Sequence, residues 1–185
     1  MRRSSMTTAG LAALLTLAAA ASAAAQGCGP TRLKVTQSVT LDMPPAQAWA
    51  LVGNFQDTSW AQNTRAVSGA GGNVPDKAMR KTTLRDGAEL EESLYKYNAE
   101  AMSYAYHIDK VDVAELPVQN TSVTVEVVPA DGGTKSTIQW RAAFYRFLAP
   151  GEPAPDIADG NAAKAVAAFG KQTLEGLKLK SEAKT

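Results

Sequence analysis

Residues 159–180 read DGNAAKAVAAFGKQTLEGLKLK, and this stretch decides the fold. Small and apolar side chains recur in it at three- and four-residue spacing, which places them on one face of a helix: Ala162, Val166, Phe169, Thr173 and Leu177. The charged residues fall mainly on other faces: Lys164, Lys171, Glu175, Lys178 and Lys180. We therefore predict an amphipathic helix, capped by Asp159 or Asn161. Gly170 and Gly176 in its interior indicate a close approach to the sheet or a slight bend.

The chain before this helix is dominated by strand patterns. Strict alternation is clearest over 33–41 and 121–128, and we predict further strands over 64–68, 77–85, 89–95, 103–108 and 135–147. A short helix is predicted to follow Asp42, its cap, with proline in its first turn, and to run to about Val52; a single helical turn over 57–61 comes after it. Residues 148–156 carry three prolines and a glycine and read as a linker.

Turn sequences between the strands define how they pair. Arg85-Asp86-Gly87-Ala88 is typical of a tight hairpin, and Asp131-Gly132-Gly133 marks another. Consecutive strands joined by hairpins form an antiparallel sheet, and the last helix must bury its apolar face against that sheet. The predicted fold class is α+β: a curved antiparallel sheet of about seven strands wrapped around a long C-terminal helix, with two short helices after the first strand.

The N-terminus has the features of a secretory signal peptide. Met1-Arg2-Arg3 is basic, residues 9–20 form an apolar run too short to span a bilayer comfortably, and Ala23-Ala24-Ala25 is a small-x-small cleavage site. We predict a signal peptide at 1–25, a single domain at 26–185, and a periplasmic or secreted protein. Cys28 is the only cysteine, which excludes an intramolecular disulfide. It is a candidate for lipidation, although Ala25 stands where a lipobox would have leucine.

Two stretches carry a resemblance to a known superfamily: LEESLYKYN (90–98) followed by SYAYHI (103–108), and LPVQNT (116–121). With the order of elements, they resemble the helix-grip (SRPBCC) superfamily of START domains, plant PR-10 proteins, polyketide cyclase-like proteins and abscisic-acid receptors. With the signal peptide, they are most similar to the periplasmic branch typified by the MxaD protein of methanol-oxidation clusters. The resemblance implies a cavity between sheet and helix that binds a small hydrophobic or amphipathic molecule, lipids included, and a partnership with a periplasmic dehydrogenase.

Glu92 is the most informative polar residue. Period-two alternation places it between Leu90 and Leu94 on the inward face of its strand. A carboxylate directed into an apolar interior requires a partner, water or a cavity. The resemblance implies that Glu92 contacts ligand through water; the alternative is an edge strand on which Glu92 is merely solvated.

The resemblance also supplies most of the other candidate site residues. It matches Arg65 to a cavity lysine, so Arg65 is the predicted partner of Glu92 or of an acidic ligand; the alternative is a surface arginine. It directs Tyr104 and Tyr106 inward, where they either contact ligand or pack in the core. The remaining predicted ligand contacts are Leu90 and Leu94 beside Glu92, Pro117 and Val118 at the cavity mouth, and Val123, Val166, Phe169 and Thr173. His107, the only histidine, alternates onto the opposite face.

Several functions are disfavoured by what the sequence contains. A formal net charge of +1 and the lack of a basic patch argue against nucleic-acid binding. No Cys/His constellation, nucleophile elbow or dinucleotide fingerprint occurs, so neither a metal nor a cofactor is expected. Three hypotheses stay open: an exported ligand-binding module; a cyclase or dehydratase in which Glu92 is the acid/base; and a protein-interaction partner of a periplasmic dehydrogenase. A single convincing titratable group favours binding over catalysis.

Overall fold

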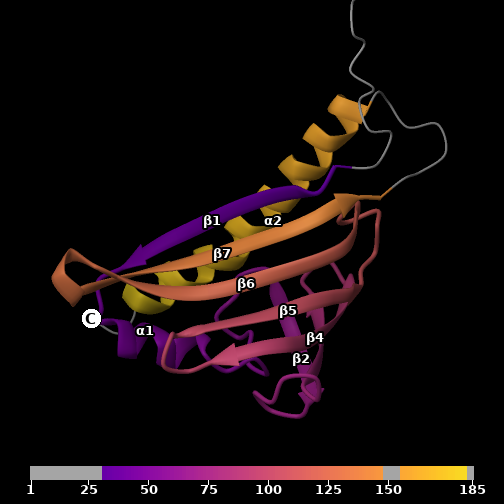
Figure 1. The fold of residues 1–185 in the computed structure, drawn as a ribbon. Helices are drawn as coiled ribbons and strands as arrows, with labels where there is room; N and C mark the ends of the chain where they lie inside the picture. Colours follow the sequence, from indigo (N-terminus) through magenta and orange to yellow (C-terminus); the bar gives the residue numbers. More distant parts are fainter. Residues whose placement is uncertain (1–30, 148–154, 183–185) are drawn as a thin grey trace, which may run out of the picture.

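The computed structural model describes residues 31–147 and 155–182. The elements within these ranges are β1 (Leu33–Leu41), α1 (Pro45–Val52), β2 (Thr64–Ala70), β3 (Met79–Leu84), β4 (Glu89–Asn98), β5 (Ser103–Lys110), β6 (Val118–Ala130), a 3-10 turn (Asp131–Gly133), β7 (Lys135–Arg146) and α2 (Pro155–Glu182). The described strands form one seven-stranded antiparallel sheet in the order β1-β7-β6-β5-β4-β3-β2 (Figure 1). The predicted fold class is confirmed.

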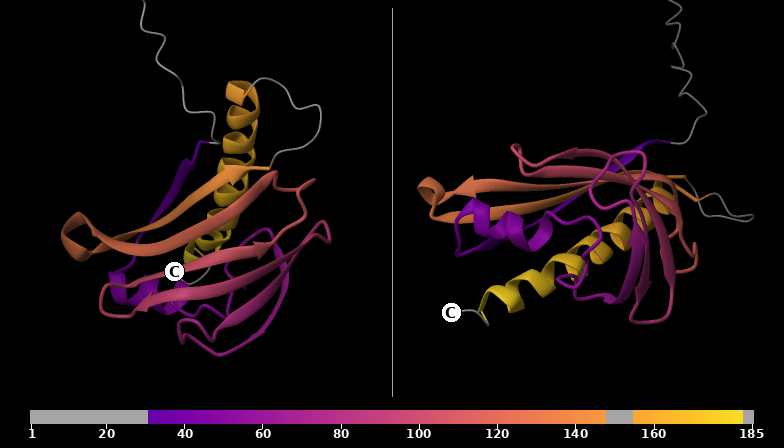
Figure 2. Two further views of the ribbon diagram at one scale, coloured as in Figure 1. Left: turned by 45° about the vertical axis from the view of Figure 1, so that its right-hand side comes forward. Right: turned by 90° about the horizontal axis from the view of Figure 1, so that it is seen from below.

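The long helix α2 lies along the concave side of the curved sheet (Figure 2) and packs mainly against β1 and β7. The predicted apolar face is confirmed, because Ala162, Val166 and Leu177 are almost completely buried. The two interior glycines lie where the packing is closest. A Cβ atom at Gly170 would come within 2.6 Å of the Trp140 ring, and one at Gly176 within 2.2 Å of the Trp60 carbonyl oxygen. The predicted close approach to the sheet is therefore confirmed at Gly170, whereas Gly176 lies against the segment before β2.

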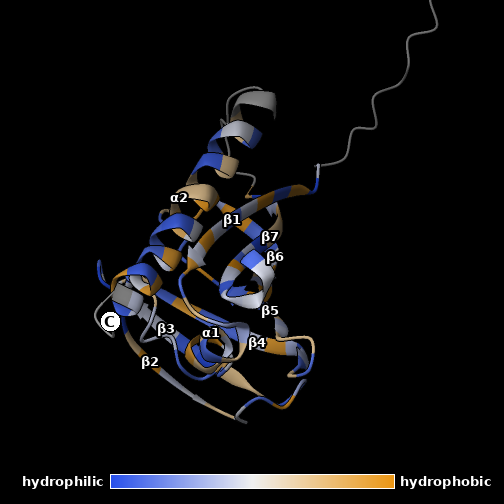
Figure 3. Ribbon diagram, turned by 90° about the vertical axis from the view of Figure 1, so that its left-hand side faces the viewer, coloured by the Kyte–Doolittle hydropathy of each residue, from blue (hydrophilic) through white to orange (hydrophobic). Residues whose placement is uncertain are grey.

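Most core side chains come from the strands, in which every second residue faces the interior. Exposed and half-buried residues alternate along β1, which can be followed as orange and blue bands in Figure 3. The largest fully buried side chains come chiefly from β4 to β7 and the segment around α1: Trp140, Tyr104, Phe55, Phe144, Leu94, Ile138, Val52, Val118, Val123 and Val125. One apolar core thus joins the sheet, α1 and α2.

Three predictions about the helices are corrected by the structure. Asp42 forms an ion pair with Lys135 (2.9 Å) and does not cap α1, whose first residue is Pro45. Residues 57–61 form hydrogen-bonded turns without a second helix. The last helix begins at Pro155, four residues before the predicted cap Asp159, since proline is compatible with the first turn of a helix.

The β3–β4 hairpin is one residue longer than predicted. Thr83 pairs with Glu89, and the Leu84 N–H donates to the Ala88 carbonyl (2.8 Å), so residues 85–87 form a three-residue loop. Gly87 has a positive φ of 100°, which allows the loop to close. The two-residue turn inferred from Asp86-Gly87 is therefore wrong, and the strand pairing is shifted by one residue.

The predicted signal peptide (1–25), Cys28 and residues 148–154 of the predicted linker lie outside the described residues. Within the described ranges, no helix is long and apolar enough to cross a membrane.

Candidate ligand-binding site

Glu92 lies inside the fold, as predicted, with its side chain only 3% exposed. Leu90 and Leu94 flank it on the inward face of β4. Its carboxylate accepts three hydrogen bonds: from Arg80 Nε (2.7 Å), from Arg80 Nη2 (3.0 Å) and from Thr82 Oγ1 (2.8 Å). This bidentate contact between arginine and a carboxylate is stronger and more directional than an ion pair with a single hydrogen bond.

Arg80 completes this group from β3, directly opposite Glu92 in the sheet. Its third nitrogen, Nη1, donates to the Phe55 carbonyl (2.6 Å), and its guanidinium lies 4.3 Å and 4.7 Å from the ring centres of Phe55 and Tyr106. Burial lowers the pKa of Arg80, but the Glu92 carboxylate more than offsets this and raises it. Arg80 and Glu92 are therefore a charged pair without net charge.

Arg65 does not take the place predicted for it. It is exposed at an irregularity in the pairing of the edge strand β2, and the partner of Glu92 is Arg80. The sequence of β3 does contain the alternation that places Arg80 inside. Arg80, Thr82 and Leu84 face the interior, and the residues between them face outward. Two adjacent cations, Arg80 and Lys81, made that alternation ambiguous until the register of the hairpin was known.

Tyr104 and Tyr106 both point inward, as predicted, and belong to an aromatic cluster with Trp49, Phe55 and Tyr97. Burial raises the pKa of Tyr104 to about 12, and it also raises the pKa of Tyr106. Both phenols are thus neutral hydrogen-bonding groups at physiological pH. His107 lies on the outer face and stacks on Tyr95, with ring centres 4.3 Å apart, which confirms its predicted orientation.

A small cavity of about 20 Å³ adjoins the Arg80–Glu92 pair, and we call it the inner cavity. Five predicted ligand contacts line it: Leu90, Glu92, Tyr106, Phe169 and Thr173. The other lining residues were not predicted: Thr58, Trp60, Ala61, Asn63, Thr64, Arg80, Thr82 and Leu84. The Thr58 side-chain oxygen is buried and has no hydrogen-bond partner within the part of the chain that the structure describes. A space of this size accommodates about one water-sized group.

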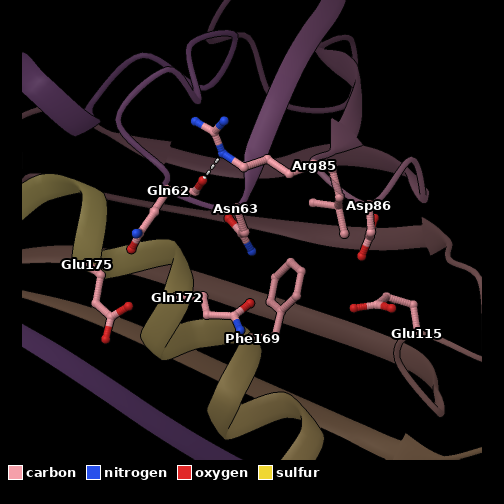
Figure 4. A pocket seen from close by; sticks show the side chains of 9 residues that line it. Gln62, Asn63, Arg85, Asp86, Glu115, Phe169, Gln172 and Glu175 are labelled. Carbon is pink, nitrogen blue, oxygen red and sulfur yellow. Dashed lines mark hydrogen bonds between the residues drawn. The ribbon is translucent and has the colours of Figure 1, made fainter.

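A larger pocket of about 380 Å³ opens beside α2, and we call it the mouth pocket (Figure 4). Its walls come from α2, the β3–β4 loop, the β5–β6 connection and the segment before β2: Phe169, Gln172, Glu175, Leu84, Arg85, Asp86, Glu115, Gln62 and Asn63. The Asp86 and Glu115 side chains point toward one another (Figure 4). Burial, with a further contribution from the Asp86 carboxylate, raises the pKa of Glu115.

The inner cavity and the mouth pocket share three wall residues: Asn63, Leu84 and Phe169. Asn63 Nδ2 donates to Thr173 Oγ1 (3.1 Å), which ties the segment before β2 to α2 at this point. Phe169 is half-buried and belongs to both spaces. The inner cavity and the mouth pocket are therefore neighbours, with the shared residues Asn63, Leu84 and Phe169 between them.

The remaining predicted contacts lie elsewhere. Leu94, Tyr104, Val118, Val123 and Val166 are buried in the apolar core and line neither space, and Pro117 is half-buried, with its carbonyl accepting from the Phe147 N–H (2.9 Å). Within the described ranges, no group of three or more His, Cys, Asp or Glu side chains is arranged to hold a metal ion.

The fold and site define a helix-grip protein, in which a curved antiparallel sheet and a C-terminal helix enclose a cavity. A family model described as "Polyketide cyclase / dehydrase and lipid transport" matches residues 32–182, and the chain belongs to this family. No curated protein compared with the chain gives a match.

Solved structures with the same fold include XoxI from Bacillus cereus, which is 21% identical over 80% of this chain and 95% of its own, with a TM-score of 0.67. The ZhuI aromatase/cyclase from Streptomyces sp. R1128 is 13% identical over 82% and 94% of the two chains, with a TM-score of 0.64. A START superfamily protein from Mycobacterium smegmatis is 11% identical over 84% and 100%, with a TM-score of 0.62. At these identities the likeness concerns the fold alone.

Proposed function

We propose that this protein is an exported binding protein for a small, mostly apolar molecule, which it holds between the sheet and α2. The observation that carries this proposal is the pair of adjoining spaces that share Asn63, Leu84 and Phe169. A mouth pocket of about 380 Å³ lies within the range of small-molecule sites. The polar groups of the inner cavity lie beyond it, where they orient a ligand.

The sizes of the two spaces dictate how such a ligand lies. Because the inner cavity measures about 20 Å³, it admits one polar atom and excludes the body of the ligand. The apolar body therefore rests in the mouth pocket against Phe169 and Leu84. Deeper entry requires a change of the Phe169 rotamer, which its half-buried position at the pocket wall permits.

Export rests on the N-terminal sequence. A basic start, an apolar run over 9–20 and small residues at 23–25 support a cleaved secretory signal. The mature protein would begin near residue 26 and act in the periplasm, as an accessory to an oxidation system or a dehydrogenase there. N-terminal sequencing of protein from a periplasmic fraction checks this: a start at Met1 or recovery from the cytoplasm contradicts it.

A cyclase or dehydratase activity is the second candidate, and the description of the family favours it. The chemistry would require Glu92 to exchange a proton with the substrate. Its carboxylate already accepts three hydrogen bonds from Arg80 and Thr82, and both inward tyrosines have raised pKa values. This arrangement suits a fixed anchor better than a proton carrier, so it supports binding over catalysis.

The decisive experiment is native mass spectrometry of the mature protein from its own periplasm, compared with the same sample after denaturation. We expect a small molecule that leaves on unfolding. A clean apo mass together with a second protein would support the interaction hypothesis in place of ligand binding.

A matched pair of variants locates the site. Gln172 lines the mouth pocket, and the neighbouring Lys171 on the same exposed side of α2 does not. Gln172→Trp fills the pocket without touching the core, so we expect about tenfold weaker binding of an environment-sensitive naphthalene dye, measured by fluorescence titration. Lys171→Trp is the control and should bind as the wild type does. Equal affinity in all three proteins would contradict this location.

A further inference from the structure

The charges of the inner cavity are already satisfied. All three nitrogens of the Arg80 guanidinium donate hydrogen bonds within the protein, to Glu92 and to the Phe55 carbonyl. Glu92 in turn accepts from Arg80 twice and from Thr82 once. A ligand that bound ionically to Arg80 would have to break a buried ion pair, which is strongly unfavourable.

Thr58 is the polar group of this cavity that lacks a partner. The residue is only 4% exposed, it lines the inner cavity, and its hydroxyl has no hydrogen bond among the described residues. A buried hydroxyl without a partner is unfavourable, so a polar atom in the cavity gains by bonding to it. Tyr106 lines the same space, and burial raises the pKa of its phenol, which is neutral.

The mouth pocket is unfavourable for an anion. Its walls carry three carboxyl groups, from Asp86, Glu115 and Glu175, and one guanidinium, from Arg85. Arg85 points out of the pocket and donates through Nε to the Gln62 carbonyl (Figure 4). An acidic ligand would therefore meet like charge at the entrance, and the one cation that the described residues place in the wall, Arg85, is directed toward the Gln62 carbonyl.

We propose that the ligand is an uncharged aromatic or alicyclic alcohol, phenol or ketone, whose single oxygen occupies the inner cavity and hydrogen-bonds to Thr58. Its ring lies in the mouth pocket against Phe169 and Leu84. This inference rests on the proposed function and narrows it, because the carboxylate ligand that Arg65 was expected to bind is excluded.

The test compares three probes of one shape: naphthalene, 2-naphthol and 2-naphthoate. Their affinities for the purified mature protein are measured by calorimetry or by quenching of tryptophan fluorescence at neutral pH. We expect 2-naphthol to bind at least about tenfold more tightly than 2-naphthoate. We also expect it to bind about three- to tenfold more tightly than naphthalene, since one neutral hydrogen bond is added.

Two threonine variants identify the hydrogen bond. Thr58→Val should weaken 2-naphthol binding about three- to tenfold and leave naphthalene within about twofold. Thr121→Val is the matched control, because Thr121 also has a buried hydroxyl without a described partner but lines a different pocket, beside His107 and Asn120. We expect Thr121→Val to bind both probes as the wild type does.

The outcomes separate this inference from the proposed function. Binding of 2-naphthoate as tight as that of 2-naphthol, or an acid as the co-purifying molecule, overturns the neutral-ligand inference and leaves the binding function standing. Equal losses of 2-naphthol affinity in Thr58→Val and Thr121→Val overturn the assignment to Thr58. If no probe binds and no small molecule co-purifies, both proposals fail.

Discussion

The two halves of the concave surface are built differently. Where α2 crosses β1 and β7, the interior is apolar and tightly packed, with Trp140, Phe144 and Val166 almost completely buried. Where β3 and β4 close the other end, the interior holds Arg80, Thr82 and Glu92 beside a cavity. A buried ion pair stabilises a fold less than well-packed apolar residues of the same volume. The buried polar residues at the β3–β4 end are therefore better explained by recognition of a ligand than by their contribution to stability.

Breaking the ion pair should have the largest effect. Arg80→Met leaves the Glu92 carboxylate buried without its cation, and we expect the free energy of unfolding to fall by about 3–5 kcal/mol. Urea denaturation followed by circular dichroism measures this.

The double variant Arg80→Met/Glu92→Leu separates stability from function. It removes both charges, so we expect it to recover most of the lost stability while binding 2-naphthol more weakly, because both side chains line the inner cavity. A double variant less stable than Arg80→Met would show that the pair itself stabilises the fold, and the contrast between the two halves would be wrong.

The packed half can be probed by adding one methyl group. Gly170→Ala places a Cβ atom 2.6 Å from the Trp140 ring, and we expect a loss of about 1–3 kcal/mol from overpacking. Gly160→Ala is the control on the same helix, because nothing lies within 4 Å of its Cβ position. That change should stabilise the protein by up to about 1 kcal/mol through helix propensity. Equal effects at both positions would mean that the contact with Trp140 is loose.

The smallest expected effect concerns Glu115, one of the three carboxyl groups in the wall of the mouth pocket. The pKa of Glu115 is raised above its ordinary value of 4.5 by burial, then by Asp86 and Asp112. The folded state therefore holds this proton more tightly, and the associated stability is present at low pH and lost as pH rises through the raised value. Glu115→Gln should gain stability relative to wild type between about pH 4.5 and neutrality. Solvent screening keeps the difference below about 1 kcal/mol, and parallel stability profiles would contradict it.

Local patterns predicted most of the fold because they depend on one element at a time. The alternation in β1 and β6 and the helical spacing of Ala162, Val166 and Phe169 required no knowledge of their partners. The inward position of Glu92 followed from Leu90 and Leu94 alone. These features were predicted correctly from neighbouring residues.

The site was harder to predict because it depends on pairing across elements. The partner of Glu92 is set by the register of β3 against β4, and the turn predicted for Asp86-Gly87 would have placed Lys81 opposite Glu92 in place of Arg80. The inner cavity also needs Thr58 and Asn63, which lie in an irregular segment without periodicity. The resemblance directed attention to Arg65, whose position on an edge strand leaves it outside both spaces.

The length of the β3–β4 loop has a consequence for how this protein tolerates mutation. A change of loop length that shifts the pairing by one residue, toward the pairing of Arg85 with Ala88, would bring Lys81 opposite Glu92 and turn Arg80 toward solvent, because neighbouring residues of a strand face opposite sides. Such a shift would leave the residues Arg80 and Glu92 themselves unchanged, yet it would disrupt their ion pair more completely than most substitutions at the inner cavity. Among related sequences, this loop should therefore vary in composition but hold its length.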